Sequence, residues 1–228
     1  MLMVAGPNGA GKTTLTRWLR GRGIDFGEYI NPDDIAEELQ GSYEKRTRQA
    51  QDIADRRREA CIEAKRSFSF ETVMSHVSKI DILRRAVAAG FFVTLFFVGT
   101  DNPQTNVERV ALRVARGGHN VPEDRIIARW SRTMGQLAEA IANTDQAFVF
   151  DNSTVGIVDG GPRLVLHWRI QNIYAPQVRL FQPMPEWVRL VHLVLHLRGQ
   201  DIRAPQVQLF QPIPDWLRHY VFQPLGMT

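Results

Sequence analysis

Short apolar runs alternate with longer amphipathic stretches along the 228-residue chain, up to about residue 150. The apolar runs predict strands at 2–5, 28–31, 67–70, 91–98 and 147–150. Between them apolar residues recur every three or four positions, which predicts helices at 12–19, 43–65, 79–89, 103–116 and 122–143. Strands and helices that alternate in this way are typical of βαβ units. We therefore expect an α/β fold with a mostly parallel sheet.

Acidic residues follow several of the predicted strands. They are Asp33, Glu71, Asp101 and Asp151. Ligands of open α/β sheets bind outside the carboxyl ends of the strands. These carboxylates are therefore expected on one rim of the sheet, where a site would be sought.

The pattern changes after about residue 170, where a segment is duplicated. Residues 175–189 (APQVRLFQPMPEWVR) recur almost unchanged as 204–218 (APQVQLFQPIPDWLR). Each copy predicts an extended piece, a Pro-x-Pro turn, and a short helix that begins at the acid and Trp. We divide the chain into a domain at 1–170 and a tail at 171–228. The tail is either a gene duplication without a dedicated role or a docking or oligomerisation segment.

Composition narrows the classes of protein. The chain is 44% hydrophobic and 23% charged, which is ordinary for a globular protein, and its formal net charge is +4. Arg supplies nearly all the positive charge and suits a phosphate-rich ligand, although solvated helix faces would give the same excess. No apolar run approaches the length of a membrane span, so we expect no membrane partner and a cytoplasmic protein. The basic run at 56–58 lacks aromatic neighbours, so nucleic acid is not the expected partner.

Residues 6–13 match the phosphate-binding pattern G-x-x-x-x-G-K-[ST] between the first predicted strand and helix. Glycines allow the backbone N–H groups of such a loop to surround a phosphate. Lys12 would reach the β- and γ-phosphates of ATP, and the Thr13 hydroxyl would bind Mg²⁺. We therefore predict a P-loop NTPase fold of three layers. The expected nucleotide-binding residues are Gly6, Asn8, Gly9, Ala10, Gly11, Lys12, Thr13 and Thr14.

Two acidic positions are candidates for handling an acceptor. Asp33 or Asp34, at the end of the second strand, could accept the proton of a substrate hydroxyl. The alternative is that both only stabilise the first turn of a helix. Glu71 could hold acceptor hydroxyls or a metal-bound water, and Thr72 is a further candidate for binding the substrate. The alternative is that Glu71 and Thr72 cap a helix.

Arginines with spacing i, i+4, i+7 lie on one face of each of two successive helices. They are Arg109, Arg113 and Arg116 in the first helix, and Arg125, Arg129 and Arg132 in the second. Gly-Gly-His-Asn-Val-Pro joins the two helices at 117–122. This arrangement suggests a lid, at about 113–129, that closes over a triphosphate. Alternatively, one of the two stripes faces water and pairs with neighbouring acids.

Four segments together resemble the zeta-toxin family of P-loop kinases, in particular its smaller, predicted-ATPase members. They are GPNGAGKTT at 6–14, NPDDIA at 31–36, FET at 70–72 and GGHNVPE at 117–123. The resemblance covers about residues 1–153. It implies ATP-dependent phosphorylation of a sugar nucleotide such as UDP-N-acetylglucosamine, with Mg²⁺ as cofactor and an antitoxin as partner.

The resemblance also assigns roles to individual residues. It implies that Asp33 rather than Asp34 is the catalytic aspartate and that Glu71 holds the substrate. It places the phosphate-clamping arginines at Arg116 and Arg129, with Arg113 next. The acceptor-binding segment differs from that of the characterised toxins, and no family element matches the duplicated tail.

Three functions remain open at this stage. The first is a sugar-nucleotide kinase in which Asp33 deprotonates the acceptor, Lys12 and Mg²⁺ hold the phosphates, and lid arginines stabilise the transition state. The second is a kinase of another hydroxylated metabolite or antibiotic. The third is an ATP-gated regulatory or interaction module that transfers no phosphate. The sequence does not indicate the oligomeric state.

Overall fold

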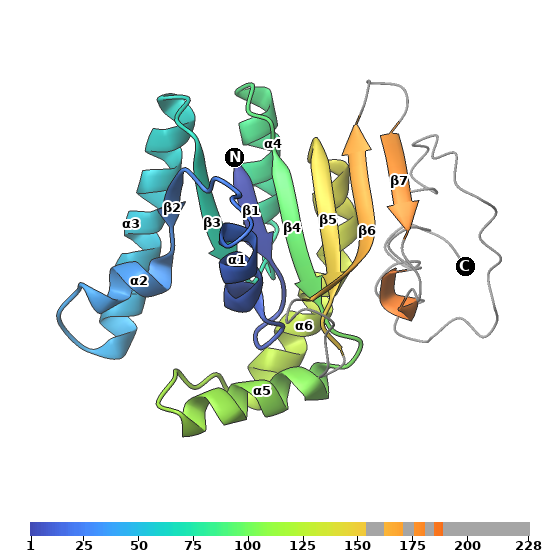
Figure 1. Ribbon diagram of the computed structural model, residues 1–228. Helices are drawn as coiled ribbons and strands as arrows, with labels where there is room; N and C mark the ends of the chain where they lie inside the picture. The colour runs from blue at the N-terminus through green and yellow to red at the C-terminus, as the bar shows by residue number, and fades with distance from the viewer. Residues whose placement is uncertain (154–161, 171–175, 181–184, 189–228) are drawn as a thin grey trace.

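The computed structural model describes residues 1–153, 162–170, 176–180 and 185–188 (Figure 1). One seven-stranded sheet has the order β2-β3-β1-β4-β5-β6-β7. The first five strands in that order pair in parallel, and β6 and β7 are added antiparallel at one edge. The strands are β1 (Leu2–Ala5), β2 (Glu28–Ile30), β3 (Phe68–Thr72), β4 (Thr94–Gly99), β5 (Gln146–Asp151), β6 (Arg163–Ile170) and β7 (Pro176–Leu180).

Helices cover both faces of the sheet, which confirms the predicted three-layer α/β fold. The helices are α1 (Lys12–Arg20), α2 (Pro32–Glu37), α3 (Tyr43–Glu63), α4 (Ser78–Ala88), α5 (Pro103–Ala115) and α6 (Glu123–Ala142). Helices α3, α4 and α6 pack on one face and α1 on the other. Helix α5 lies beyond the carboxyl ends of the parallel strands (Figure 1).

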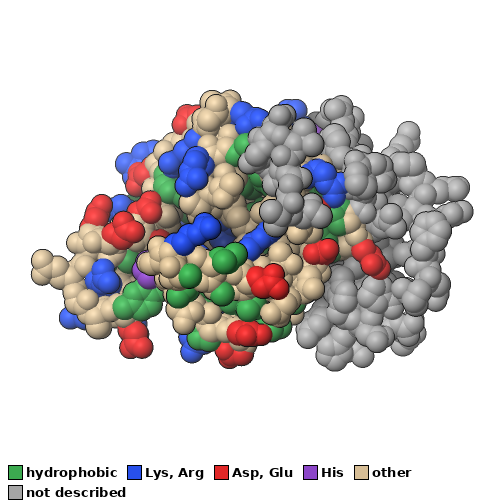
Figure 2. Space-filling view, turned by 60° about the horizontal axis from the view of Figure 1, so that its bottom comes forward, with side chains coloured by type: hydrophobic (Ala, Val, Ile, Leu, Met, Phe, Trp, Pro, Cys, Tyr) green, Lys and Arg blue, Asp and Glu red, His purple; other side chains and the backbone are tan. Residues whose placement is uncertain are grey.

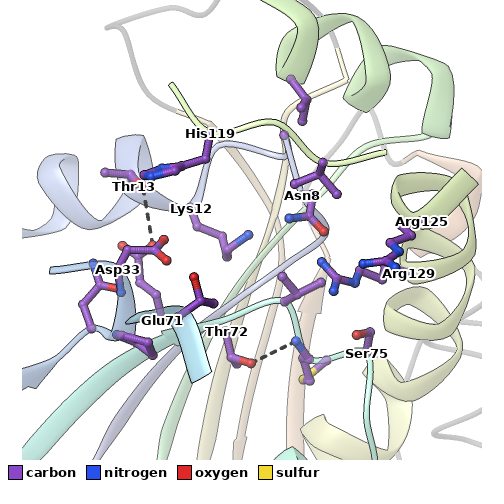
Figure 3. A pocket seen from close by; sticks show the side chains of 18 of the residues that line it. Asn8, Lys12, Thr13, Asp33, Glu71, Thr72, Ser75, His119, Arg125 and Arg129 are labelled. Carbon is purple, nitrogen blue, oxygen red and sulfur yellow. Dashed lines mark hydrogen bonds between the residues drawn. The ribbon is translucent and has the colours of Figure 1, made fainter. Parts of the chain in front are cut away.

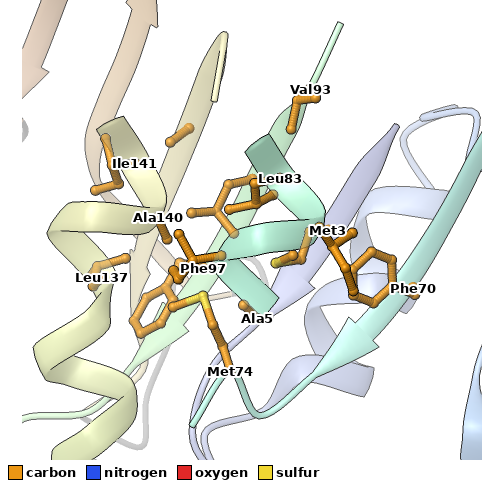
Figure 4. Close-up of a cluster of buried hydrophobic side chains, with 14 of the residues drawn as sticks. Met3, Ala5, Phe70, Met74, Leu83, Val93, Phe97, Leu137, Ala140 and Ile141 are labelled. Carbon is orange, nitrogen blue, oxygen red and sulfur yellow. The ribbon is translucent and has the colours of Figure 1, made fainter. Parts of the chain in front are cut away.

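Side chains that alternate along β1 divide the core into two clusters. Met3 and Ala5 belong to the larger cluster under α3, α4 and α6 (Figure 4), whereas Val4 packs with Leu15 and Leu19 of α1. All three β1 side chains are fully buried. A strand that is buried on both faces is expected to read as a continuous apolar run, as this one does. This packing holds the end of β1, and thus the start of the glycine-rich loop, in a fixed position.

Local signals place the first residues of α2 correctly. The Asn31 side chain accepts a hydrogen bond from the Asp33 backbone N–H at 3.1 Å, and Pro32 occupies the first turn. Strand β3 continues two residues further than predicted, through Glu71 and Thr72, because its parallel partner β1 extends as far as Ala5. Glu71 therefore has the fixed backbone of a strand rather than that of a loop.

The part of the chain after β5 differs from the expectation. Strand β6 was not predicted, and β7 continues the sheet beyond residue 170, where we expected the domain to end. β7 coincides with the extended piece of the first repeat copy, and residues 186–188 are helical, beginning at the acid. Trp187 is buried, and a Cβ added to Gly99 of β4 would lie 2.9 Å from its ring.

The described residues of the first copy are therefore part of the sheet and its core. The second copy, at 204–218, lies outside the described residues. The division at residue 170 and the role of the tail stay predictions.

Candidate active site

A cavity of about 680 Å³ opens at the carboxyl ends of the parallel strands. It brings together the glycine-rich loop, the start of α2, the end of β3 and the facing sides of α5 and α6. Its acidic lining residues are Asp33 and Glu71. Its Lys and Arg residues are Lys12, Arg58, Lys79, Arg109, Arg113, Arg125 and Arg129. Figure 2 shows basic side chains around the hollow on this face, so the cavity suits a polyanion.

Two asparagines outside the loop hold its backbone in place. The Asn106 side chain donates to the Asn8 carbonyl at 2.6 Å, and the Asn152 side chain donates to the Ala10 carbonyl at 2.8 Å. Gly9 has φ +76°, and a Cβ there would lie 2.6 Å from the Asn106 carbonyl oxygen. Gly11 has φ +102°. The glycines are therefore required both for the turn and for the close approach of these partners.

We expect Asn106→Leu to weaken both the fold and nucleotide binding. Asn106 is fully buried; its side chain donates to the Asn8 carbonyl, and its side-chain oxygen accepts from the Thr100 hydroxyl, so the change removes both hydrogen bonds. The expected loss of unfolding free energy is about 1–3 kcal/mol, measured by urea denaturation. Asn143→Leu, near the C-terminal end of α6, is the control and should leave ATP affinity unchanged. Wild-type affinity in Asn106→Leu would contradict a role in positioning the loop.

Lys12 folds back over the loop. Its Nζ donates to the carbonyl oxygens of Gly6 at 2.9 Å and Pro7 at 3.0 Å. Burial lowers the pKa of Lys12 to about 8; Glu71 and Asp33 oppose this shift, whereas Arg113 and Arg129 add to it. A bound phosphate would raise this pKa again, because it favours the charged form.

Nucleotide affinity should therefore fall as the pH rises through 8. If only the charged form of Lys12 binds ATP, the apparent affinity at pH 9 should be about tenfold lower than at pH 7. The sign follows from the lowered pKa, because the ligand-free protein loses the Lys12 charge within this interval. Isothermal titration of a non-hydrolysable ATP analogue at both pH values measures the change. Equal affinities would mean that Lys12 keeps its charge in the empty loop.

Three hydroxyl groups orient the Glu71 carboxylate. It accepts hydrogen bonds from Thr16 at 2.5 Å, Tyr29 at 2.9 Å and Thr13 at 3.4 Å. Burial raises the pKa of Tyr29, and the neighbouring Glu71 adds to the rise, so the phenol stays a donor. Mg²⁺ in kinases takes few protein oxygens and keeps water and phosphate ligands. The adjacent Thr13 and Glu71 oxygens fit that requirement, with Thr13 as the predicted direct ligand.

Asp33 and Asp34 differ in their surroundings. Asp33 lines the cavity, and among the described residues no side chain donates a hydrogen bond to its carboxylate. Asp34 does not line it, and its carboxylate accepts from the Asn31 side chain at 2.8 Å. Burial raises the pKa of Asp34, and Glu37 and Asp33 add to the rise. The geometry thus leaves Asp33 free to receive a proton from a ligand.

The predicted lid arginines separate into two groups. Arg113 and Arg129 line the cavity, and Figure 3 shows Lys12 between the two acids on one side and Arg125 and Arg129 on the other. Arg116 does not line it. It lines a neighbouring cavity of about 360 Å³, which shares Arg109 and Arg113 with the first cavity. The structure therefore does not bring Arg116 to the loop.

Arg109 and Arg125, which the helical spacing had placed on the two arginine stripes, also line the cavity. Neither was among the arginines that the resemblance assigned to clamping phosphate. Asp101 and Asp151 do not line the cavity, although they were expected on the same rim, and Asp151 pairs with Arg163 at 2.9 Å. No local pattern in the sequence indicates the hydrogen bonds that Tyr29, Thr16, Asn106 and Asn152 make in the site. Their hydrogen-bond partners there are distant in sequence.

The loop between α5 and α6 reaches across to α3. The His119 ring stacks on Tyr43, with 5.2 Å between ring centroids, and the His119 carbonyl accepts from Arg113 at 3.0 Å. Both His119 and Tyr43 line the cavity. The predicted lid is thus in contact with the opposite wall.

Among the described helices, none is long and apolar enough to cross a membrane.

Known proteins resemble this chain in sequence and in fold. Residues 1–168 match the family model described as "Zeta toxin". An uncharacterized protein of Haemophilus influenzae is 33% identical over 63 residues, which are 28% of this chain and 45% of that protein.

Among solved structures, AvrRxo1-ORF1:-ORF2 with ATP has a TM-score of 0.60 at 15% identity, over 93% of this chain and 66% of that one. The PezAT toxin-antitoxin system of Streptococcus pneumoniae has a TM-score of 0.49 at 15% identity, over 71% and 68%. The chain thus spans less than two thirds of two of these proteins.

Proposed function

The chain belongs to the zeta toxin family, and on that premise we propose that it transfers the γ-phosphoryl group of ATP to a hydroxyl of a small acceptor. The observation that carries this proposal is the place of Asp33. Its uncommitted carboxylate lines the same cavity as Lys12 and the glycine-rich loop. A carboxylate so placed can act as a general base toward a hydroxyl that faces the nucleotide.

In the proposed reaction Asp33 takes the proton of the acceptor hydroxyl while that oxygen bonds to the γ-phosphorus. The bond between the γ-phosphorus and the β–γ bridging oxygen breaks, and ADP leaves with that oxygen. Lys12 and the cavity-lining arginines Arg113, Arg125 and Arg129 donate to phosphate oxygens and stabilise the charge that develops. Bound at Thr13, Mg²⁺ would supply further charge neutralisation.

The acceptor we propose is a sugar nucleotide such as UDP-N-acetylglucosamine. Family membership supports this class, and the cavity extends past Glu71 to polar residues of α3, which leaves room beyond the nucleotide. The test incubates the protein with ATP, Mg²⁺ and UDP-N-acetylglucosamine and analyses the products by mass spectrometry. A phosphorylated sugar nucleotide supports the proposal. If a different metabolite from a wider panel is phosphorylated instead, the proposed kinase activity would stand and the proposed acceptor would be wrong.

We also propose that an antitoxin protein restrains this activity. The AvrRxo1 and PezAT structures are described as a two-component complex and as a toxin-antitoxin system. Expression of the chain in bacteria should arrest growth, and Lys12→Ala should relieve the arrest. Arrest by both forms alike would contradict toxicity through phosphotransfer.

A further inference from the structure

Two cations of the cavity lie apart from the nucleotide-binding groups. Arg109, Arg113, Arg125 and Arg129 come from α5 and α6 and face the glycine-rich loop. Arg58 and Lys79 come from α3 and α4, on the side of the cavity formed by β3 and the segment that follows it. The proposed phosphotransfer does not use either of them.

Arg58 is buried to an extent unusual for a charged residue. Only 2% of its side chain is exposed, and its guanidinium lies over the Phe70 ring at 4.9 Å from the centroid. Its NH2 group pairs with Asp55, one turn earlier in α3. Its Nε, also buried, has no hydrogen-bond partner. A buried guanidinium is costly unless it is paired, and the paired acid here is Asp55.

Lys79 shares the same counter-charge. Its Nζ lies 3.8 Å from Asp55, and its side chain is 21% exposed. The pKa of Lys79 is lowered by burial and then by the neighbouring Arg58. Asp55 itself is 55% exposed, so two cations depend on one half-solvated carboxylate. The pair therefore has an excess of positive charge that faces the cavity.

Neutral polar side chains connect this pair to the rest of the cavity. Thr47, Gln51 and Arg58 lie on one face of α3, since they are spaced by four and seven residues, and all three line the cavity. The start of α3 lies next to α2, where Arg46 donates to the Ala36 carbonyl at 3.3 Å. Arg58 is about three turns further along α3 than Thr47. The pair thus lies away from the end of the cavity at which Asp33 would act.

We propose that Arg58 and Lys79 form a subsite for an anionic group of the acceptor, either a phosphate or a carboxylate. This inference rests on the proposed kinase function and assigns the residues that would hold the anionic group of the acceptor, such as the diphosphate of a sugar nucleotide. A guanidinium and an ammonium group offer charge-assisted hydrogen bonds to either kind of oxyanion. The reacting hydroxyl lies at the Asp33 end and the anionic group at the Arg58 end.

The test uses the full chain saturated with Mg²⁺ and a non-hydrolysable ATP analogue, so that the glycine-rich loop is filled. Inorganic phosphate is then titrated by calorimetry, and acetate in a second series shows whether a carboxylate is preferred. Lys79→Met should weaken binding of the preferred anion at least about tenfold, which corresponds to about 1.4 kcal/mol. Lys79→Arg should retain it. Lys45→Met, an exposed lysine of α3 that does not line the cavity, should bind as the wild type does.

Neither phosphate nor acetate binding to the filled protein, or equal binding by Lys79→Met, would overturn the subsite. Because the titration needs no turnover, it is independent of the kinase proposal. If the protein binds the anion but phosphorylates no acceptor, the subsite proposal would stand and the kinase proposal would fail. A protein that phosphorylates neutral and anionic acceptors equally well, with no effect of Lys79→Met on KM, would be a kinase without the subsite.

Discussion

Asp33→Asn is expected to lower kcat by about 10²- to 10⁴-fold, the usual contribution of a general base. ATP affinity should stay close to the wild-type value, because among the described residues the Asp33 side chain forms no hydrogen bond with the glycine-rich loop, and the amide is nearly isosteric. The cap of α2 should persist, since Asp33 contributes its backbone N–H to Asn31. Steady-state kinetics with the identified acceptor, together with calorimetric titration of an ATP analogue, measure the two quantities separately.

Asp34→Asn is the matched control for this prediction. Asp34 is the next residue in the same turn, it does not line the cavity, and its carboxylate is already engaged by Asn31. The variant should retain kcat within a small factor. Comparable losses in both variants would indicate that the two acids act by stabilising α2, and the general-base role of Asp33 would be lost.

Arg129→Met is expected to lower kcat by about 10²- to 10³-fold, as expected on removing a donor that stabilises charge in the transition state. Arg129 projects from α6 toward Lys12 (Figure 3) and lines the cavity. The methionine preserves much of the aliphatic volume, so α6 should keep its packing. The measurement is kcat at saturating ATP and acceptor, with thermal unfolding as the check on folding.

Arg116→Met tests whether Arg116 clamps phosphate, as the resemblance implies, or lies outside the active-site cavity, as in the structure. The resemblance predicts a loss similar to that of Arg129→Met. Because Arg116 does not line the cavity that contains Lys12 and Asp33, the structure predicts a nearly unchanged kcat. A large loss in Arg116→Met would mean that the loop after α5 rearranges on nucleotide binding and brings Arg116 to the phosphates.

Local physical chemistry accounts for the parts of the fold that the sequence predicts. The glycine-rich loop needs glycines at positive φ, and the Asn-Pro-Asp segment carries the cap and the proline of a helix start. These signals depend on neighbours within a few residues. They placed the loop and the start of α2 correctly, and the predicted family and fold are confirmed.

Tertiary contacts decide what the sequence leaves undetermined. Helical spacing groups Arg109 with Arg113 and Arg125 with Arg129. It does not show which arginine of a stripe is the last to line the cavity. Arg116 follows the last residue of α5, and its direction depends on the turn at Gly117, where φ is +86°. For this reason the spacing alone could not separate Arg116 from the arginines that line the cavity.

The basic run at 56–58 illustrates the same limit. It falls within the helix predicted at 43–65, and Arg56 and Arg57 are exposed. Arg58 is buried because the face of α3 that contains Ala50, Ala54 and Cys61 packs on the sheet and includes it. When a helix has few apolar residues, its sequence alone does not show which of its polar residues are buried. The buried residues become clear only once the partner strand is known, which here is β3 with Phe70.

The fate of the γ-phosphoryl group tests the central claim most directly. ATP labelled in that group is incubated with the protein, Mg²⁺ and a metabolite library, and the labelled products are separated and identified by mass spectrometry. We expect the label to appear in one class of hydroxylated small molecule, and we expect Asp33→Asn to form this product at least about 100-fold more slowly than the wild type. Nucleotide binding without any labelled organic product, or an unchanged rate of product formation by Asp33→Asn, would contradict the proposed phosphotransfer.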